Sequence, residues 1–394
     1  MKTVDNKFNS IPSGKLGIIV HPSCEKLGNM IDKYIVDWRK NRETSESEAI
    51  HFQDYARDTF IIKCTCSRFG TGEAKALLHS SVRGADLYIL ADVLNYSLQY
   101  KVCGHMNHMS PDDIYADIKR IIAAASGKPR SITVIMPFLY ESRQHKRSSR
   151  ESLDCAFALQ ELANIGVDNI LTFDAHDPRV QNAIPLKGFD NVMPTYQFLK
   201  ALLHNMHDLH IDNDHLMVIS PDEGAMNRAM YFANVLGVDI GMFYKRRDYS
   251  VVVNGRNPIV AHEFLGASVE GKDVLIIDDM ISSGESMLDV ARELKRRKAN
   301  RVICISTFGM FTNGLDSFDQ AFKDGTIYRV TTTNSTYQTP ELLEREWYIS
   351  TDVSKYIALL IDSMNHGASI SRILNPHDRI KNRLAEYEQF HDIQ

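Results

Sequence analysis

The chain has 394 residues, of which 44% are hydrophobic and 24% charged, a composition typical of globular proteins. This length predicts two domains of similar size. A net charge of −5 argues against a nucleic-acid-binding surface, which needs a basic excess. No stretch approaches the roughly 18 apolar residues of a membrane span, and the N-terminus has no signal-peptide core. We therefore expect a cytoplasmic protein with no nucleic-acid or membrane partner.

The cysteines predict neither disulfides nor zinc. There are six, with no Cys-x-x-Cys spacing. Cys64 and Cys66 are the only close pair, and their period-2 spacing would put both thiols on one face of a strand, where a structural role is expected.

Short apolar runs alternate with amphipathic helical patterns along the chain. The predicted strands are 16–20, 61–64, 87–90, 132–136, 170–173, 216–219, 240–243, 274–277 and 301–305. The predicted helices are 25–42, 112–126, 151–165, 195–207, 224–236 and one that begins near 285. Such alternation implies parallel sheets covered on both faces. We predict an α/β fold of two doubly wound parallel-sheet domains, 12–190 and 191–375, with a C-terminal tail at 376–394. The amphipathic segment 353–366 is expected to pack back on the first domain.

One stretch combines a strand, two carboxylates and a helix start. The buried strand 274–277 leads into Asp278 and Asp279, and a hydroxyl- and glycine-containing turn at 282–286 opens a helix. A helix N-terminus has unpaired N–H groups that favour an anion, and carboxylates accept hydrogen bonds from vicinal sugar hydroxyls. The stretch predicts a sugar-phosphate site; the alternative is a capped turn with two solvated aspartates.

Three further predicted strand ends carry polar clusters, at 136–144, 174–177 and 220–224. Ligands of open α/β sheets bind at the carboxyl ends of the strands, so these clusters also predict a functional site. The sequence has no Gly-x₄-Gly-Lys-Ser/Thr segment, which excludes a P-loop kinase.

The Asp-Asp stretch resembles the ribose-phosphate-binding signature of type I phosphoribosyltransferases and of ribose-phosphate pyrophosphokinases. Other segments over residues 60–375 resemble the pyrophosphokinases in their order along the chain. These segments are Arg68–Glu73, Ser81–Asp86, Arg143-Gln144 with Lys146 and Arg147, Phe173–Pro178, Ser220–Gly224 and Tyr244–Arg247. Ordinary phosphoribosyltransferases have one such domain and lack the Arg-Gln and Asp-x-His segments. The chain thus resembles a divergent ribose-phosphate pyrophosphokinase, with two domains of the type I phosphoribosyltransferase kind.

The resemblance implies a ribose-phosphate diphosphokinase, which transfers the diphosphoryl group of ATP to the 1-hydroxyl of ribose 5-phosphate. The products would be AMP and phosphoribosyl pyrophosphate. It also implies Mg²⁺ as cofactor and a homo-oligomer of dimers that build into hexamers. The implied roles are catalysis by Lys245 and Arg247; ATP binding by Arg143, Gln144, Phe69 and Glu73, the last two from a neighbouring subunit; ribose 5-phosphate binding by Asp278, Asp279, Ser282, Ser283, Gly284, Glu285 and Ser286; magnesium binding by His176 and Asp222; and effector-phosphate binding by Ser81 and Arg83.

Residue chemistry leaves alternatives for several of these roles. Lys245 and Arg247 suit developing phosphoryl charge, but a Lys-Arg-Arg run is also typical of a solvated loop. Arg143 and Gln144 would otherwise form surface salt bridges, and Glu73 would otherwise sit in a hairpin turn. The sequence departs from the family at Thr71, Ala225, Ser282 and Phe308, and segments 20–58, 95–128 and 250–264 are longer than usual.

Two other hypotheses remain. One is a non-catalytic regulatory paralogue that assembles with active subunits; such proteins usually lose residues that this chain retains. The other is a phosphoribosyltransferase that consumes phosphoribosyl pyrophosphate, against which the ATP-like clusters of the first domain argue.

Overall fold

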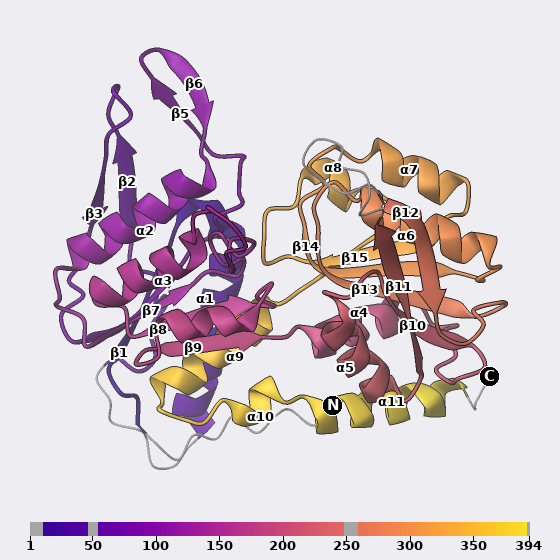
Figure 1. Ribbon diagram of the computed structural model, residues 1–394. Coiled ribbons are helices and arrows are strands. Elements are labelled where there is room, and N and C mark those ends of the chain that lie inside the picture. Colours follow the sequence, from indigo (N-terminus) through magenta and orange to yellow (C-terminus); the bar gives the residue numbers. More distant parts are fainter. Residues whose placement is uncertain (1–10, 46–53, 248–258, 392–394) are drawn as a thin grey trace. The chain divides into compact units, whose positions relative to one another are not determined.

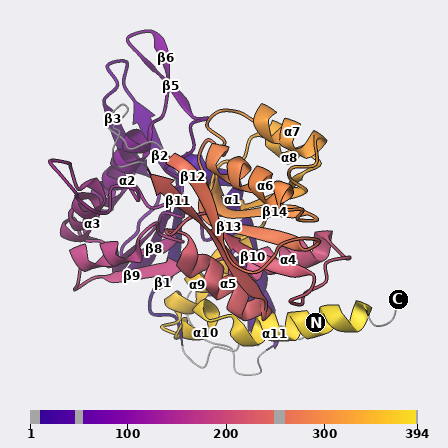
Figure 2. The ribbon, with the colours of Figure 1, turned by 45° about the vertical axis from the view of Figure 1, so that its right-hand side comes forward.

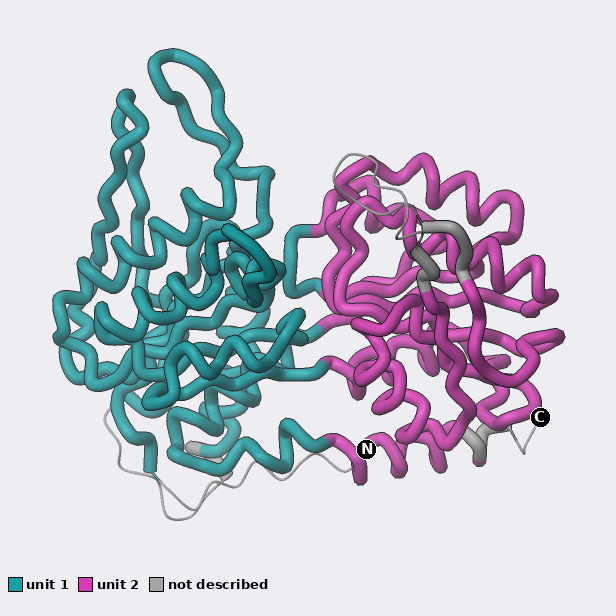
Figure 3. Tube along the Cα trace, viewed as in Figure 1, with its two compact units in different colours: residues 1–193, 334–337, 353–375 teal, residues 194–333, 338–352, 376–394 magenta. Residues whose placement is uncertain are grey.

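The computed structural model describes residues 11–45, 54–247 and 259–391, and the chain divides into two compact units (Figure 3). Unit 1 comprises 1–193, 334–337 and 353–375, and unit 2 comprises 194–333, 338–352 and 376–394. Each unit has its own, mainly parallel sheet, so the predicted α/β fold with two parallel-sheet domains is confirmed. Among the described residues, none of the helices combines the length and apolarity needed to cross a bilayer.

The unit 1 sheet has five parallel strands in the order β1-β4-β7-β8-β9 (Figure 1). Its central strands are apolar runs that are buried along almost their whole length, as expected for strands covered on both faces. The strands are β1 Lys15–Val20, β4 Ala85–Leu90, β7 Ser131–Ile135, β8 Asn169–Phe173 and β9 Gly188–Val192. The helices are η1 Pro22–Cys24, α1 Glu25–Ser45, α2 Pro111–Ala125, α3 Asp154–Asn164, η2 Pro178–Ala183, α9 Ser354–Asn365 and α10 Ser371–Leu374.

Helix α9 returns late in the chain to pack on α1 of unit 1. Arg39 Nε donates to the Asp362 carboxylate at 2.9 Å, and both side chains are buried. The predicted domain boundaries put residues 353–375 in the second domain, but the structure places them in unit 1. The reason is the packing of α9, whose apolar face and buried ion pair with Arg39 hold it on α1. The expected packing of 353–366 on the first domain is thereby confirmed.

Two antiparallel hairpins project from the same end of unit 1 (Figures 1 and 2). Strand β2 (Cys64–Arg68) pairs with β3 (Ala74–Leu78), and β5 (Gln99–Val102) pairs with β6 (His105–His108). The predicted strand at 61–64 is wrong in its bounds, because pairing with β3 begins only at Cys64; Ile61 makes an isolated bridge to Ile18.

The unit 2 sheet has the order β12-β11-β10-β13-β14-β15-β16, and only the edge pair β11–β12 is antiparallel. Side chains alternate between faces along β13, so Val274 and Ile276 join a core with α6, whereas Leu275 and Ile277 join a core with α4 and α5. The strands are β10 Leu216–Ser220, β11 Asp239–Arg247, β12 Ile259–Leu265, β13 Asp273–Ile281, β14 Val302–Gly309, β15 Arg329–Thr333 and β16 Tyr348–Thr351. The helices are α4 Thr195–Asn205, α5 Met226–Leu236, α6 Glu285–Arg296, α7 Asp316–Lys323, α8 Pro340–Leu343 and α11 His377–His391.

Candidate functional site

Two adjacent carboxylates lie near the carboxyl end of β13. Asp279 is buried, and its backbone N–H donates to Asp278 Oδ1 at 2.8 Å. Arg228, from α5, places Nη2 3.6 Å from Asp279 Oδ2. Burial and the neighbouring charges of Asp279 and Asp222 raise the pKa of Asp278 well above its ordinary value. The site therefore concentrates negative charge, which a cation or hydroxyl donors would stabilise.

The turn after β13 presents the start of a 12-residue helix, α6. Gly284 is the N-cap with φ +88°, and its carbonyl accepts the first helical hydrogen bond, from Leu288 N at 2.9 Å. The Ser282 carbonyl accepts from Thr312 N, which fixes the turn from the other side. Ser282 and Ser283 are half-buried, and Glu285 and Ser286 are exposed. The predicted ribose 5-phosphate residues are thus contiguous, with the carboxylates at one end and a helix N-terminus at the other.

The Asp222 cluster follows β10, which runs parallel to β13 as its direct neighbour. Asp222 Oδ1 accepts hydrogen bonds from Gly224 N at 3.0 Å and Ala225 N at 3.3 Å. Because Asp222 contributes to the raised pKa of Asp278, three carboxylates share this edge of the unit 2 sheet. Ala225, where the family usually has glycine, has φ −86°, a conformation that any residue adopts without strain.

In unit 1, two polar segments meet after β7 and β8. His176 N donates to the buried Ser142 Oγ at 3.2 Å, which ties the segment of His176 to that of Arg143 and Gln144. Glu141 and Asp174 have φ +55° and +39°, unusual values for non-glycine residues and common at functional sites. Arg143, Gln144 and His176 are exposed.

Sequence reasoning missed His145 in this region. Its ring centroid lies 5.1 Å from that of His176, and its Nε2 lies 3.7 Å from Asp177 Oδ2. Burial and the charge of His176 lower the pKa of His145. The only signal in the sequence was its position directly after Arg143-Gln144.

The predicted adenine-side residues, Phe69 and Glu73, close the β2–β3 hairpin. Phe69 N donates to the Glu73 carbonyl at 2.7 Å, and both side chains are exposed. The hairpin-turn alternative for Glu73 describes its backbone correctly, and its carboxylate accepts a hydrogen bond from Thr71. Ser81 and Arg83 form a small exposed turn in which Ser81 Oγ accepts from Arg83 N at 3.3 Å.

Lys245 and Arg247 lie on the last part of β11, which pairs with β12 in antiparallel fashion. The predicted strand ended at Phe243, and the structure corrects this because the pairing continues to Arg247. The side chains of 245–247 and residues 248–258 lie outside the described residues, so the catalytic role of Lys245 and Arg247 stays a prediction.

Comparisons with known proteins cover both units. Residues 16–166 match the N-terminal domain of ribose phosphate pyrophosphokinase, and residues 189–342 match the phosphoribosyl transferase domain. The ribose-phosphate pyrophosphokinase of Vibrio parahaemolyticus is 29% identical over 313 residues, which is 78% of this chain and 90% of the relative. That of Mycoplasma genitalium is 27% identical over 268 residues, covering 66% of this chain and 73% of the relative.

The chain belongs to the ribose-phosphate pyrophosphokinase family. It is a distant member, as the identity of about 29% indicates. A crystal structure of phosphoribosylpyrophosphate synthetase from Mycobacterium smegmatis shares its fold, with a TM-score of 0.70 and 19% identity, over 90% of this chain and 100% of that one.

Besides Ala225, the chain departs from the pyrophosphokinase family pattern at three positions, and the structure shows what surrounds the side chain at two of them. Thr71 Oγ1 donates to Glu73 Oε2 at 3.0 Å, a bond that an aspartate at 71 would replace with repulsion. Phe308 is buried in β14 opposite Met280, so its aromatic ring is part of the sheet packing. Nothing in the structure explains Ser282 in place of an acidic residue.

Proposed function

We propose that the protein is a ribose-phosphate diphosphokinase, which transfers the β,γ-diphosphoryl group of ATP to the anomeric hydroxyl of ribose 5-phosphate. The single observation that carries the proposal is the unit 2 site, where Asp278 and Asp279 lead directly into the turn that starts α6. Carboxylates accept from sugar hydroxyls and a helix N-terminus binds phosphate, so one segment suits both ends of the sugar phosphate. Family membership over both domains supports ATP as the second substrate.

Within this proposal, Asp278 and Asp279 hold the ribose 2- and 3-hydroxyls, and 282–286 bind the 5-phosphate. Arg143, Gln144, Phe69 and Glu73 bind ATP. Lys245 and Arg247 stabilise the charge that develops on the transferred group and its leaving oxygen. Ser81 and Arg83 take an effector phosphate. Homo-oligomerisation through dimers is part of the same proposal.

The described residues fit a magnesium ion. Mg²⁺ prefers carboxylate oxygens, and the mutual repulsion of Asp222 and Asp278 is a feature that a divalent cation would relieve. By resemblance to the family, we propose that Asp222 and His176 each bind magnesium. When bound, the ion neutralises phosphate charge and orients the nucleotide.

The test is AMP formation by the purified chain, followed with ATP, Mg²⁺ and ribose 5-phosphate. AMP should appear only when ribose 5-phosphate is present, and phosphoribosyl pyrophosphate should form in equal amount. Omitting Mg²⁺ with EDTA present should abolish both products. Absence of turnover under these conditions would exclude the proposal and leave the regulatory paralogue. Release of pyrophosphate from phosphoribosyl pyrophosphate in the presence of a base would indicate a phosphoribosyltransferase instead.

A further inference from the structure

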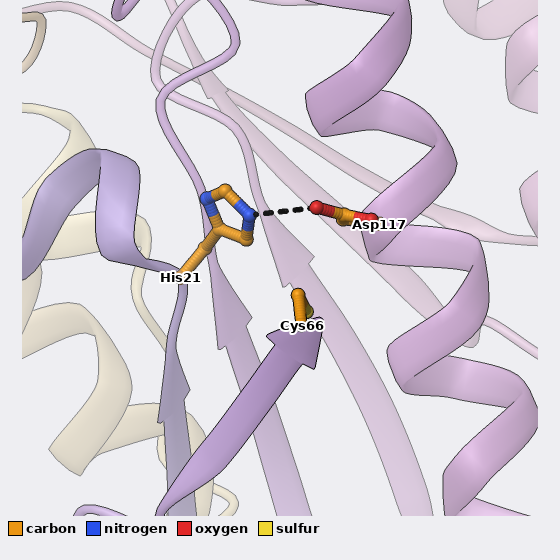
Figure 4. Close-up of side chains that lie close together, drawn as sticks. All are labelled: His21, Cys66 and Asp117. Carbon is orange, nitrogen blue, oxygen red and sulfur yellow. Dashed lines mark hydrogen bonds and ion pairs between the residues drawn. The ribbon is translucent and has the colours of Figure 1, made fainter. Parts of the chain in front are cut away.

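A cluster of polar side chains, in which His21 and Asp117 are buried and Cys66 is half-buried, lies outside the residues assigned above. His21, Cys66 and Asp117 come from the end of β1, from β2 and from α2, and their ligand atoms lie within 4.8 Å of one another (Figure 4). Such a set could in principle hold a soft divalent metal.

Hydrogen bonding argues against a metal at this cluster. His21 Nδ1 accepts the backbone N–H of Ser23 at 3.1 Å, so the ring proton resides on Nε2, which faces Asp117 Oδ2 at 3.4 Å. To bind a metal through Nε2, the His21 ring would have to move its proton to Nδ1. The Ser23 N–H already points at Nδ1, so this tautomer is disfavoured. Asp117 is also already neutralised, because Arg68 and Arg120 both donate to it. The cluster is therefore a network of ion pairs and hydrogen bonds around the Asp117 carboxylate.

Asp117 anchors Arg68, the last residue of β2. Arg68 donates in bidentate fashion, Nη1 to Oδ1 at 2.6 Å and Nη2 to Oδ2 at 2.9 Å, and both side chains are largely buried. Burial opposes ionisation of Asp117, but hydrogen bonds from His21 and Arg68 lower its pKa to about 2. A bidentate arginine–carboxylate pair fixes orientation as well as distance. The strand residue directly before Phe69 is thus held in a defined place on α2.

The β5–β6 hairpin also contacts the turn between β2 and β3. The Tyr100 ring packs on the Arg68 guanidinium, 5.1 Å from Cζ to the ring centroid, and Tyr100 Oη donates to Asp113 Oδ1 of α2 at 3.0 Å. Cys103 N donates to the Gly70 carbonyl at 2.7 Å. A Cβ on Gly72 would lie 3.5 Å from Val102. This hairpin belongs to the segment that is longer here than is usual for the family.

We infer that Asp117 and Tyr100 are positioning residues for the nucleotide side of the reaction. Asp117 accepts two hydrogen bonds from the Arg68 guanidinium, and the Tyr100 ring packs on that guanidinium. Together they fix the turn that presents Phe69 and Glu73. Neither touches the nucleotide in this assignment; they act through Arg68 and the turn. The inference rests on the proposed function, because that function assigns Phe69 and Glu73 to the nucleotide.

The test is a graded series at Tyr100 in the full-length protein. Tyr100→Phe removes only the bond to Asp113, whereas Tyr100→Leu also removes the ring from Arg68. We expect the KM for ATP to rise in that order, by about fivefold for Tyr100→Leu, which converts to about 1 kcal/mol. The KM for ribose 5-phosphate and kcat should stay unchanged. The matched control is Lys101→Ala, at an exposed neighbouring position of β5, and it should leave both KM values and kcat unchanged.

A second pair of variants tests the anchor. Asp117→Asn keeps the shape but loses the charge, and Arg68→Lys keeps the charge but loses the fork. Both should weaken ATP binding, measured by isothermal titration with Mg²⁺ and ATP, and circular dichroism will show whether each variant is folded. If Asp117→Asn does not fold, Arg68→Lys and the Tyr100 series still decide the outcome.

The outcomes separate this inference from the proposed function. A wild-type protein that binds ATP but forms no AMP excludes the proposed function, and the titrations of the variants still test the positioning role. Active wild type with an unchanged ATP KM in Tyr100→Leu overturns the inference alone. Equal rises in both substrate KM values, or a wild type that binds no ATP, also overturn it.

Discussion

Gly284 lies directly against the ring of Phe318. A Cβ at position 284 would come within 2.3 Å of Phe318 Cε2, and the glycine has φ +88°, where a side chain is strained in any case. Phe318 cannot retreat, because it is fully buried and stacks on Trp347 at 5.5 Å between ring centroids. The N-terminal end of α6 therefore packs against the apolar core of unit 2.

The variant Gly284→Ala should lower both stability and sugar-phosphate binding. A left-handed conformation alone costs a non-glycine residue roughly 1–2 kcal/mol, and the clash with Phe318 adds to it. The KM for ribose 5-phosphate should rise about tenfold or more, as expected when over about 1.4 kcal/mol of binding energy is lost. Thermal unfolding and initial rates measure the two effects.

Gly314→Ala is the matched control for this experiment. Gly314 has φ +81°, but a Cβ there would meet nothing within 4 Å. It should therefore show the backbone cost without the clash, and leave the KM for ribose 5-phosphate unchanged. Equal effects of the two substitutions would contradict the role assigned to Phe318.

The central parallel strands were predicted because each is a continuous apolar run. The parallel strands β9, β15 and β16 were not predicted, because their sequences are more polar. Leu87–Leu90 and Val274–Ile277 lie within β4 and β13 as expected. The Asp-Asp pair was expected directly after the strand 274–277, but it lies within β13, which continues to Ile281. The strands of the two hairpins were not predicted correctly, because their side chains are mostly half-buried or exposed and their sequences show no strong apolar periodicity.

Long-range partners were beyond local patterns. Arg68 and Asp117 are 49 residues apart, and Arg39 and Asp362 are 323 apart. Nothing in the spacing of either pair predicts its contact, because tertiary folding alone brings them together. For the same reason the sequence could not show that β5–β6 contacts the turn of Phe69.

Asp278→Asn should stabilise the protein while weakening its substrate binding. The folded protein raises the pKa of Asp278, so the carboxyl binds its proton more tightly when folded, and stability falls as pH rises from the unfolded pKa through the folded one. Asparagine keeps the acceptor for Asp279 N but removes the repulsion. We expect a higher Tm than wild type at neutral pH, with the gain disappearing near the ordinary aspartate pKa of about 4.

The same variant should raise the KM for ribose 5-phosphate, because an amide accepts fewer hydrogen bonds than a carboxylate. Asp289→Asn, at an exposed position of α6, serves as the control and should alter Tm little, since surface ion pairs contribute little. A lower Tm for Asp278→Asn across the whole pH range would refute the repulsion argument.

Lys245→Ala should reduce kcat far more than it weakens ribose 5-phosphate binding. If the ammonium acts on charge that develops in the transition state, its loss should cost about 10²–10³-fold in kcat. Arg246→Ala, the residue between the two predicted catalytic side chains, is the control and should retain most of the activity. Equal losses of kcat and of substrate affinity for Lys245→Ala would argue against a transition-state role.

The ionisation of Asp92 should govern part of the pH dependence of the stability of unit 1. Its carboxylate is fully buried and accepts hydrogen bonds from Leu94 N at 3.0 Å and from Tyr337 N at 2.7 Å, so it ties residues 334–337 to the end of β4. Burial outweighs these two bonds and raises the pKa of Asp92 to about 7. Because the folded pKa exceeds the unfolded value, this group's contribution to stability falls as pH rises from about 4 to about 7 and is constant above.

Asp92→Asn should remove that fall. The Tm of the variant relative to wild type should increase between about pH 5 and about pH 7 and then level off, as measured by differential scanning fluorimetry in one buffer system. The amide oxygen of the introduced side chain can still accept one of the two backbone bonds, so the variant should fold. A Tm difference that is independent of pH would mean that Asp92 ionises at its ordinary pKa, and that the bonds from Leu94 N and Tyr337 N outweigh its burial.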